Sequence, residues 1–283
     1  MGKIKIVIIL TICSIFLLLG CNKKLDENTQ ENVTIDIHND VVSKTDEEDN
    51  SYNDKNIVNE KEENNIEKDT KRLENENRKI IVIDPGHSSV GNPEKEPISP
   101  NSSKTKAKDV LGATGNYTNI PEHKTTVNIG LLLKDELIDR GYNVVMTKSE
   151  VDKSLSNIER AEIGNENNAD LVIRIHADSS NDTNVKGASI LIPSKNEYTK
   201  SISDISMNYG KKIIDTYTNE LNIKNRGCIY RDDMTGFNWS KVPVVILEMG
   251  FLSNKEDDEF ISNVSNHSNI AKSIANGIDK CFE

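Results

Sequence analysis

Three short runs of apolar residues, rich in Val and Ile, are each followed by a histidine or a glutamate. β-Branched residues pack well on the pleated surface of a sheet, so each run predicts a buried strand. The runs are residues 80–83, followed after the turn Asp84-Pro85-Gly86 by His87; residues 171–175, followed by His176; and residues 242–247, followed by Glu248. Ligands bind beyond the carboxyl ends of the strands in open α/β sheets. Three such endings therefore predict one shared site at one edge of a sheet.

Helical patterns alternate with strand patterns along residues 79–283. Apolar residues recur at helical spacing near 121–140, 154–168, 197–222, 256–262 and 268–281, and further strands are expected at 142–147, 186–192 and 228–231. This alternation predicts an α/β fold with a mostly parallel sheet that is covered by helices on both faces. A segment of this length can bury one full core, so we expect a single domain.

A long polar stretch, residues 88–120, separates the first strand from the first helix. It contains three prolines and three glycines, which predicts a loop without regular structure. Loops of this length in compact domains are usually functional. Because this one leaves from the turn that carries His87, we expect it to form part of a rim around the site.

The first 21 residues have the pattern of a targeting segment. Lys3 and Lys5 precede an almost wholly apolar run that closes with Leu18-Leu19-Gly20-Cys21. The run is short for a membrane-spanning helix and suits a signal peptide. Its ending resembles the lipobox of bacterial lipoproteins, in which the cysteine becomes the lipidated first residue. We therefore expect a lipoprotein signal peptide in residues 1–21 and a lipid on Cys21 that anchors the protein at the extracytoplasmic face of the cell membrane. An uncleaved anchor helix is the alternative.

Residues 22–78 are acidic and of low complexity. They contain 9 Lys and Arg against 17 Asp and Glu, so they carry −8 of the formal net charge of −11. Such a segment buries too little apolar surface to offset the entropy of ordering, which predicts a disordered linker. The remaining part has 24 basic and 29 acidic side chains. It lacks the basic stripe that nucleic-acid binding requires.

Two cysteines, Cys228 and Cys281, fall in the predicted domain. In an oxidising compartment they can form a disulfide, but we favour two unrelated thiols. Their spacing matches no metal-binding motif.

Five histidines occur, one in the acidic linker and one near the C-terminal end; the other three are His87, His123 and His176. A hydrolytic zinc site takes three protein ligands of nitrogen and oxygen type and keeps one position open for water. His87, His176 and the carboxylate of Glu122 supply such a set. His123 competes with Glu122 for the third place, because adjacent helical residues point about 100° apart and only one of them normally reaches the site. Glu248 is the candidate for the carboxylate that accepts and returns a proton.

Each assignment has a structural alternative. A histidine at a strand end can serve as a hydrogen-bonded structural residue, and Glu122 can be a first-turn glutamate that the helix dipole favours. Glu248 can pair with Arg160 or Arg174. Asp84 can orient a metal ligand, although Asp before Pro also fits an ordinary turn.

Residues 79–283 resemble the zinc-dependent N-acetylmuramoyl-L-alanine amidases of the type 3 catalytic family. The most specific match is Glu248-Met249-Gly250-Phe251-Leu252-Ser253-Asn254, which follows an apolar strand. The other matching pieces are Ile81 to His87, Glu122 ahead of a long helix, Ser154-Leu155 through Arg160-Ala161, and Arg174 to Asp178.

The resemblance implies that His87, Glu122 and His176 bind Zn²⁺ and that Glu248 is the catalytic residue. It implies a mixed, mainly parallel six-stranded sheet flanked by helices, with 79–283 as the amidase catalytic domain. The implied reaction hydrolyses the amide between the lactyl group of N-acetylmuramic acid and L-alanine in peptidoglycan. A non-catalytic peptidoglycan-binding lipoprotein, and another zinc hydrolase that acts on wall peptides, are the alternatives.

Overall fold

The structure, a computed structural model, describes residues 78–283. The predicted signal peptide, Cys21 and the predicted linker up to residue 77 lie outside the described residues. The strands are β1 (Ile80–Pro85), β2 (Asn92–Pro97), β3 (Thr105–Asp109), β4 (Asn143–Met146), β5 (Leu171–Asp178), β6 (Ala188–Pro193), β7 (Asn225–Arg231) and β8 (Val244–Phe251). The helices are α2 (Glu122–Asp139), α3 (Asn157–Glu166), α4 (Ser203–Leu221), α5 (Thr235–Asn238), α6 (Lys255–Ser262) and α7 (Val264–Phe282).

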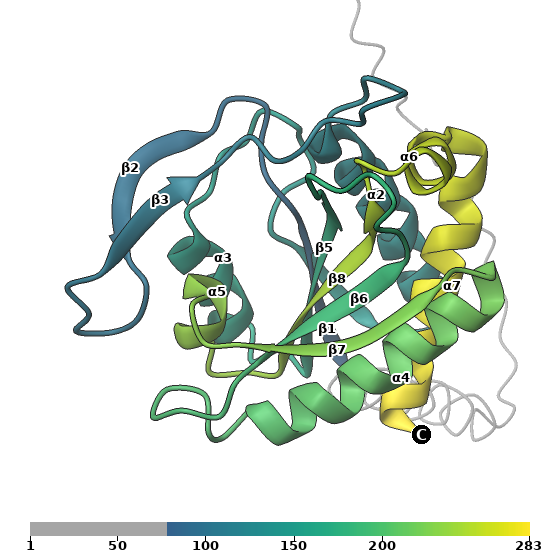
Figure 1. The fold of residues 1–283 in the computed structure, drawn as a ribbon. Coiled ribbons are helices and arrows are strands. Elements are labelled where there is room, and N and C mark those ends of the chain that lie inside the picture. Colours follow the sequence, from purple (N-terminus) through teal and green to yellow (C-terminus); the bar gives the residue numbers. More distant parts are fainter. Residues whose placement is uncertain (1–77) are drawn as a thin grey trace, which may run out of the picture. The chain divides into compact units, whose positions relative to one another are not determined.

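Six strands form one sheet in the order β4-β1-β5-β8-β6-β7 (Figure 1). Neighbouring strands are parallel except at β6, which runs antiparallel to β8. The predicted α/β fold with a mostly parallel, mixed six-stranded sheet is therefore confirmed. Since β1, β5 and β8 are parallel neighbours at the centre, their carboxyl ends lie at the same edge of the sheet. His87, His176 and Glu248, which follow these strands or lie near their ends, therefore lie at that edge too.

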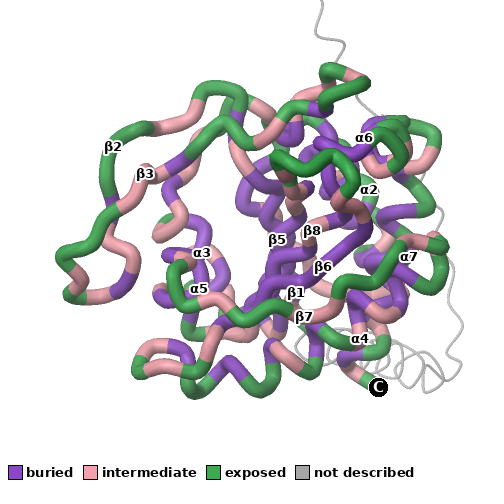
Figure 2. The backbone as a smooth tube through the Cα atoms, in the orientation of Figure 1, coloured by how far each residue is buried: buried purple, intermediate pink, exposed green. Residues whose placement is uncertain are grey.

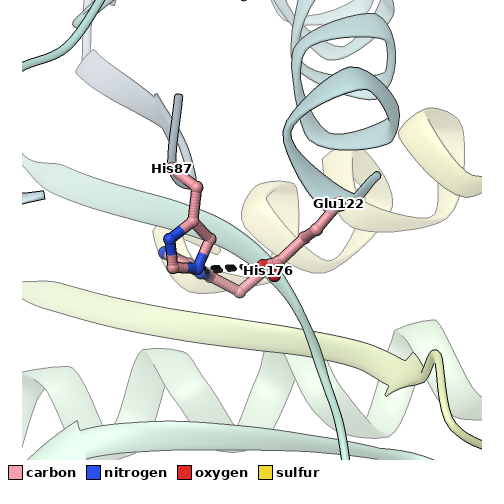
Figure 3. A group of neighbouring side chains, drawn as sticks. All are labelled: His87, Glu122 and His176. Carbon is pink, nitrogen blue, oxygen red and sulfur yellow. Dashed lines mark hydrogen bonds and ion pairs between the residues drawn. The ribbon is translucent and has the colours of Figure 1, made fainter. Parts of the chain in front are cut away.

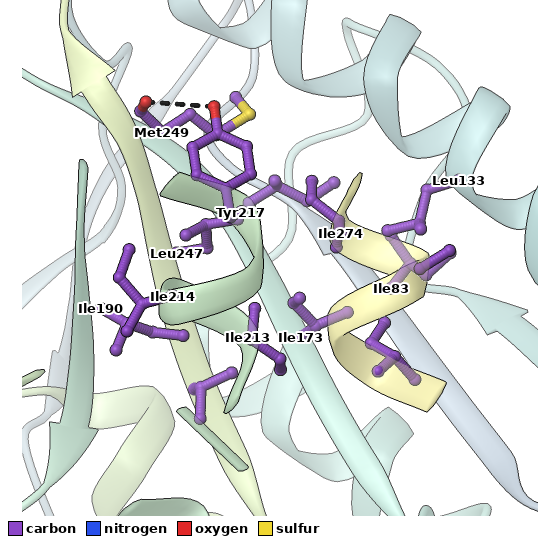
Figure 4. Close-up of a cluster of buried hydrophobic side chains, with 14 of the residues drawn as sticks. Ile83, Leu133, Ile173, Ile190, Ile213, Ile214, Tyr217, Leu247, Met249 and Ile274 are labelled. Atoms are coloured by element: carbon purple, nitrogen blue, oxygen red, sulfur yellow. Dashed lines mark hydrogen bonds between the residues drawn. The ribbon is translucent and has the colours of Figure 1, made fainter. Parts of the chain in front are cut away.

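One face of the sheet packs on α2, α7 and α4 and holds the larger apolar core (Figure 4). Alternate strand residues such as Ile83, Ile173 and Leu247 point into it and are fully buried. Ile274 of α7 and Tyr217 of α4 meet them from the helix side. Fully burying one such aliphatic side chain contributes about 1.5–3 kcal/mol, so this face supplies most of the stability that comes from burial.

The other face packs on α3 and α5 and has a smaller apolar cluster that includes Val82, Val172 and Ile246. Side chains alternate along a strand, so the next residues on this face, nearer the carboxyl ends, are polar. They are Asp84, Arg174, His176 and Glu248. Helices thus cover both faces, as predicted. The polar residues of the candidate site lie on the face that fewer helices cover. We call the two sides the core face and the cleft face.

Residues 88–120 are not the structureless loop that the sequence predicts. They contain the antiparallel hairpin of β2 and β3, which lies on the side of α3 and α5 (Figure 1). Glu96 accepts hydrogen bonds from the backbone N–H groups of Asn157 and Ile158 at the start of α3. Asp109 accepts hydrogen bonds from the hydroxyls of Ser88 (2.6 Å) and Ser154 (2.9 Å). The hairpin is therefore anchored through buried carboxylates rather than through apolar contacts, which is why no hydrophobic pattern marks it.

The burial pattern of the backbone (Figure 2) separates the buried strands from the exposed hairpin. In residues 78–283 no helix is long and apolar enough to cross a membrane. Cys228 and Cys281 are both free, so the expectation of two unrelated thiols is confirmed and the disulfide alternative is wrong.

Candidate metal centre

His87 lies just beyond β1 in a left-handed backbone conformation, with φ of 60°. Its Nδ1–H donates to the carbonyl of Val110 at 2.8 Å, which leaves Nε2 to face Glu122 Oε1 at 3.4 Å. The ammonium of the buried Lys148 donates to the carbonyl of His87. Burial alone would lower the pKa of His87, but the carboxylate of Glu122 raises it. The turn after β1 thus directs Nε2 of His87 toward the carboxylate of Glu122.

Glu122 is the first residue of α2 and points toward both imidazoles (Figure 3). Its Oε1 accepts from the backbone N–H of Ala177 at 3.1 Å and lies 3.1 Å from His176 Nδ1. Its Oε2 accepts from the backbone N–H of Ala113 at 2.9 Å. Burial alone would raise the pKa of Glu122, but the two histidines hold it well below its usual range. The side chain is therefore a fixed carboxylate, ready to bind a cation.

His176 occupies the cleft face of β5, and its ring covers Gly86. A Cβ at Gly86 would lie 2.4 Å from His176 Cε1, so the turn before His87 requires glycine. Burial lowers the pKa of His176 to about 4, against the opposing effect of Glu122, and this keeps the imidazole in its neutral, metal-binding form at pH 7. Its Nε2 is buried and has no hydrogen-bond partner in the part of the chain that the structure describes.

The ligand atoms of His87, Glu122 and His176 all lie within 4.8 Å of one another. The structure thus brings together the three residues that the sequence nominated from three separate segments. It leaves the competitor His123 outside, because that ring turns toward the carbonyl of Leu111, 3.4 Å from its Nδ1. Glu122 rather than His123 completes the group.

Glu248 lies beside this group, since it is the register partner of His176 on the neighbouring strand. Among residues 78–283 no side chain forms a hydrogen bond or ion pair with its carboxylate. The alternative that it pairs with Arg160 or Arg174 is wrong. Burial, together with the carboxylates of Glu122 and Asp178, raises the pKa of Glu248 well above its usual range. A cation bound by Glu122 would reduce the electrostatic repulsion between the carboxylates of Glu122 and Glu248.

The two arginines pair with Asp84 instead. Arg160 Nη1 donates to Asp84 Oδ1 and Arg174 Nε to Asp84 Oδ2, each at 2.6 Å, while the hydroxyl of Thr147 adds a third bond at 2.6 Å. Burial alone would raise the pKa of Asp84, but the two guanidinium groups hold it well below its usual range. Asp84 touches none of the three grouped residues, so the idea that it orients a ligand is wrong. Through these two ion pairs, Asp84 joins β1 to β5 and to α3.

Two hollows adjoin the group formed by His87, Glu122 and His176. The larger, about 300 Å³, lies between the hairpin and the cleft face, and its lining includes Lys106, Val110, Arg174, His176 and Glu248. The second, about 260 Å³, lies on the α2 side and is lined in part by Ala113, Glu122 and Asp178. The predicted rim is confirmed, because residues of 88–120 line both hollows. The sequence predicts this rim only through the length of the segment, because no residue pattern in 88–120 marks the individual residues that line the hollows.

Comparison with known proteins decides the family. The family model Amidase_3, described as N-acetylmuramoyl-L-alanine amidase, matches residues 81–280. The chain belongs to this amidase family. The predicted family and enzyme class are therefore confirmed, and His87, Glu122 and His176 all lie within the matched residues.

Two solved structures share the fold of this chain, and one further protein is similar to it in sequence. The apo form of the N-acetylmuramyl-L-alanine amidase Ami1 from Mycobacterium abscessus is 24% identical, with a TM-score of 0.66 over 72% of this chain and 99% of that chain. Cwp6 from Clostridium difficile is 25% identical, with a TM-score of 0.59 over 73% of this chain and 30% of that chain. The protein YqiI of Bacillus subtilis (strain 168) is 26% identical over 172 residues, which are 61% of this chain and 79% of the relative.

Proposed function

We propose that this amidase uses zinc, held by His87, Glu122 and His176, to hydrolyse the amide between the lactyl group of N-acetylmuramic acid and L-alanine. The observation that carries the proposal is the grouping of two imidazoles and one carboxylate within 4.8 Å in a chain of the amidase family. Catalytic zinc takes this kind of donor set and keeps a position open. The unpartnered Nε2 of His176 and the low pKa of Glu122 fit a cation at this place.

The residues around the group supply the rest of the chemistry. When bound, zinc polarises a carbonyl and lowers the pKa of water to about 7. Glu248 accepts the proton of the attacking water and passes it to the departing alanine nitrogen. Its raised pKa suits a group that must hold a proton between these two steps. The backbone N–H groups of Ala113 and Ala177 keep both oxygens of Glu122 in place.

Digestion of purified peptidoglycan tests the proposal. The full chain, loaded with zinc, should release peptides that begin with a free L-alanine and leave intact lactyl groups on the glycan, as read by mass spectrometry. A chelator should stop the release and added zinc should restore it. Shortened peptides that remain on the glycan would favour a wall-peptide hydrolase instead. Binding to peptidoglycan without any release would favour a non-catalytic lipoprotein.

We further propose that a lipid on Cys21 anchors the protein at the extracytoplasmic face of the membrane. The support is the basic start, the apolar run and the closing Leu-Leu-Gly-Cys of the first 21 residues. A linker of this length, at most about 3.3–3.6 Å per residue, could carry the domain to the wall. Metabolic labelling with a fatty acid should mark the wild-type protein, whereas Cys21→Ser should remain unlabelled. Labelling of Cys21→Ser would contradict the assignment.

A further inference from the structure

The two hollows share His87, His176 and Glu248 but differ in charge. The larger one adds three cations, Lys106, Arg160 and Arg174, and one carboxylate, Asp109, whereas the smaller one adds two carboxylates, Glu122 and Asp178, and no cation. A substrate that extends to both sides of the metal group therefore meets a basic side and an acidic side. Charge can decide which half of the substrate enters which hollow.

Lys106 is the cation of the larger hollow that lacks a partner. It is half-buried on β3, and its ammonium has no hydrogen bond or ion pair among residues 78–283. The two nearby carboxylates are already engaged elsewhere. Glu96 accepts hydrogen bonds from the start of α3, and Asp233 pairs with Arg231 through two bonds of 2.8 Å.

The position of Lys106 is unfavourable for a charge. Burial, and then the guanidinium of Arg174, lower its pKa from the ordinary lysine value. Arg174 cannot relieve the repulsion, because it is held on the cleft face by Asp84 at 2.6 Å and by Asn157 at 3.2 Å. An anion in the hollow would therefore meet the unpaired ammonium of Lys106, whereas the guanidinium of Arg174 already has the carboxylate of Asp84 as its counter-charge.

The hairpin holds Lys106 firmly against the cleft. The flanking residues of the two strands, Glu96 and Asp109, are buried and bonded to α3, Ser88 and Ser154. Glu96 is moreover the register partner of Lys106 across the hairpin. The backbone that carries Lys106 is therefore already fixed, and only the side chain of Lys106 has to be ordered when it binds a ligand.

We propose that Lys106 binds a free carboxylate of the stem peptide, so that the peptide lies in the larger hollow and the glycan in the smaller one. This inference rests on the proposed function. The N-acetylated glycan is uncharged at the cleaved unit, whereas an acidic stem peptide is attracted by Lys106 and repelled by Asp178 on the other side. Lys106 makes the contact, and Arg174 adds to the positive field from beneath.

The test compares two soluble muramoyl peptides that differ at one group. Both carry L-alanyl-γ-D-glutamyl-L-lysine; in one the α-carboxylate of the glutamyl residue is free, and in the other it is amidated. The full chain with zinc should show a kcat/KM about tenfold higher for the free carboxylate. Lys106→Gln should remove this preference by raising KM for the acidic substrate alone, and Lys106→Arg should retain most of it.

Lys95→Gln is the matched control, because it removes an exposed positive charge from the other strand of the same hairpin, outside the lining of the hollow. It should keep the preference. An independent readout is calorimetric binding of the free tripeptide, acidic or amidated, to the zinc-loaded full chain. Lys106→Gln should weaken binding of the acidic tripeptide about tenfold and leave the amidated one unchanged.

Three results would overturn the inference: no preference in the wild type, equal losses on both substrates in Lys106→Gln, or the same loss in Lys95→Gln. If the wild type binds the acidic tripeptide through Lys106 but hydrolyses neither substrate, the proposed function fails while the carboxylate site stands. If it hydrolyses both substrates equally well, the proposed function stands and the carboxylate site fails.

Discussion

Along β5, neighbouring side chains enter opposite environments. Ile173 and Ile175 point into the core face, where α2 and α7 bury them completely. Arg174 and His176 alternate with them and point to the cleft face, where they meet Asp84 and Glu122. The same contrast holds on β8, where Leu247 lies in the core and Glu248 in the cleft.

The difference between the faces is one of free energy. Apolar residues on the core face gain stability from burial without any partner. Buried charges on the cleft face pay for desolvation and remain only because ion pairs, hydrogen bonds or a bound cation offset that penalty. Substitutions on the core face should therefore change stability and spare activity. Those on the cleft face should act on activity, metal binding or acid sensitivity, and on stability where they leave a buried charge without its partner.

The largest effect is expected from Glu248→Gln on the cleft face. The amide cannot accept the proton of water, so kcat should fall about 10²–10⁴-fold. Zinc content and melting temperature should stay near the wild-type values, because no protein group of residues 78–283 is hydrogen-bonded to this carboxylate. The exposed Glu256→Gln is the control and should retain full activity. Undiminished turnover by Glu248→Gln would remove the residue from the mechanism.

Asp84→Asn should cost the most stability, about 3–5 kcal/mol, because it leaves Arg160 and Arg174 buried without their counter-charge. Chemical denaturation measures the loss. Asp204→Asn, whose ion pair with Lys195 is exposed, should change stability by less than about 1 kcal/mol.

The pH dependence of the same variant gives a second measurement. Asp84 has a pKa below its ordinary value of 3.8, so on acidification the unfolded chain binds the proton first. Its contribution to stability is complete above the ordinary value and is lost as the pH falls below it toward the depressed pKa of the folded state. Asp84→Asn should lack this part of the acid dependence. Parallel stability curves for the two proteins between pH 5 and about pH 2 would contradict the assignment.

Ile274→Ala tests the core face. The side chain is fully buried on α7, far in sequence from every site residue, and its truncation should lower the free energy of unfolding by about 2–5 kcal/mol. Below the melting temperature, kcat/KM should be unchanged. Val264→Ala, on the same helix but 71% exposed, should shift stability by no more than about 0.5 kcal/mol. A selective loss of activity in Ile274→Ala would show that the two faces are coupled.

Lys148→Met should have the smallest effect of the series. It removes the donor to the carbonyl of His87 and keeps the length of the side chain. Loss of such an outer hydrogen bond should weaken zinc binding about 10–100-fold, as measured by competition with a chromophoric chelator. The exposed Lys153→Met should bind zinc as the wild type does. Equal zinc affinity in the two variants would show that the turn holds His87 without Lys148.

Much of the site could be predicted from the sequence because strand periodicity is local. Apolar runs ending at His87, His176 and Glu248 indicated buried strands with polar carboxyl ends, and parallel pairing brings such ends together. The alternation of strands and helices also predicted the layers of the fold. These inferences needed only neighbouring residues.

The rest depended on contacts between distant segments. Only the packed position of α2 chose Glu122 over His123, because the rotation of a helix about its axis is set by what it packs against. Likewise, only the tertiary structure shows that Asp84 accepts hydrogen bonds from Arg160 and Arg174 and not from a residue of the His-Glu-His group. The hairpin of β2 and β3 carries no apolar alternation, since carboxylates bonded to α3 and to Ser88 hold it in place. The sequence by itself determined which residues end the strands, and the tertiary structure decided their partners, because hydrogen bonds and ion pairs join residues that no local pattern relates.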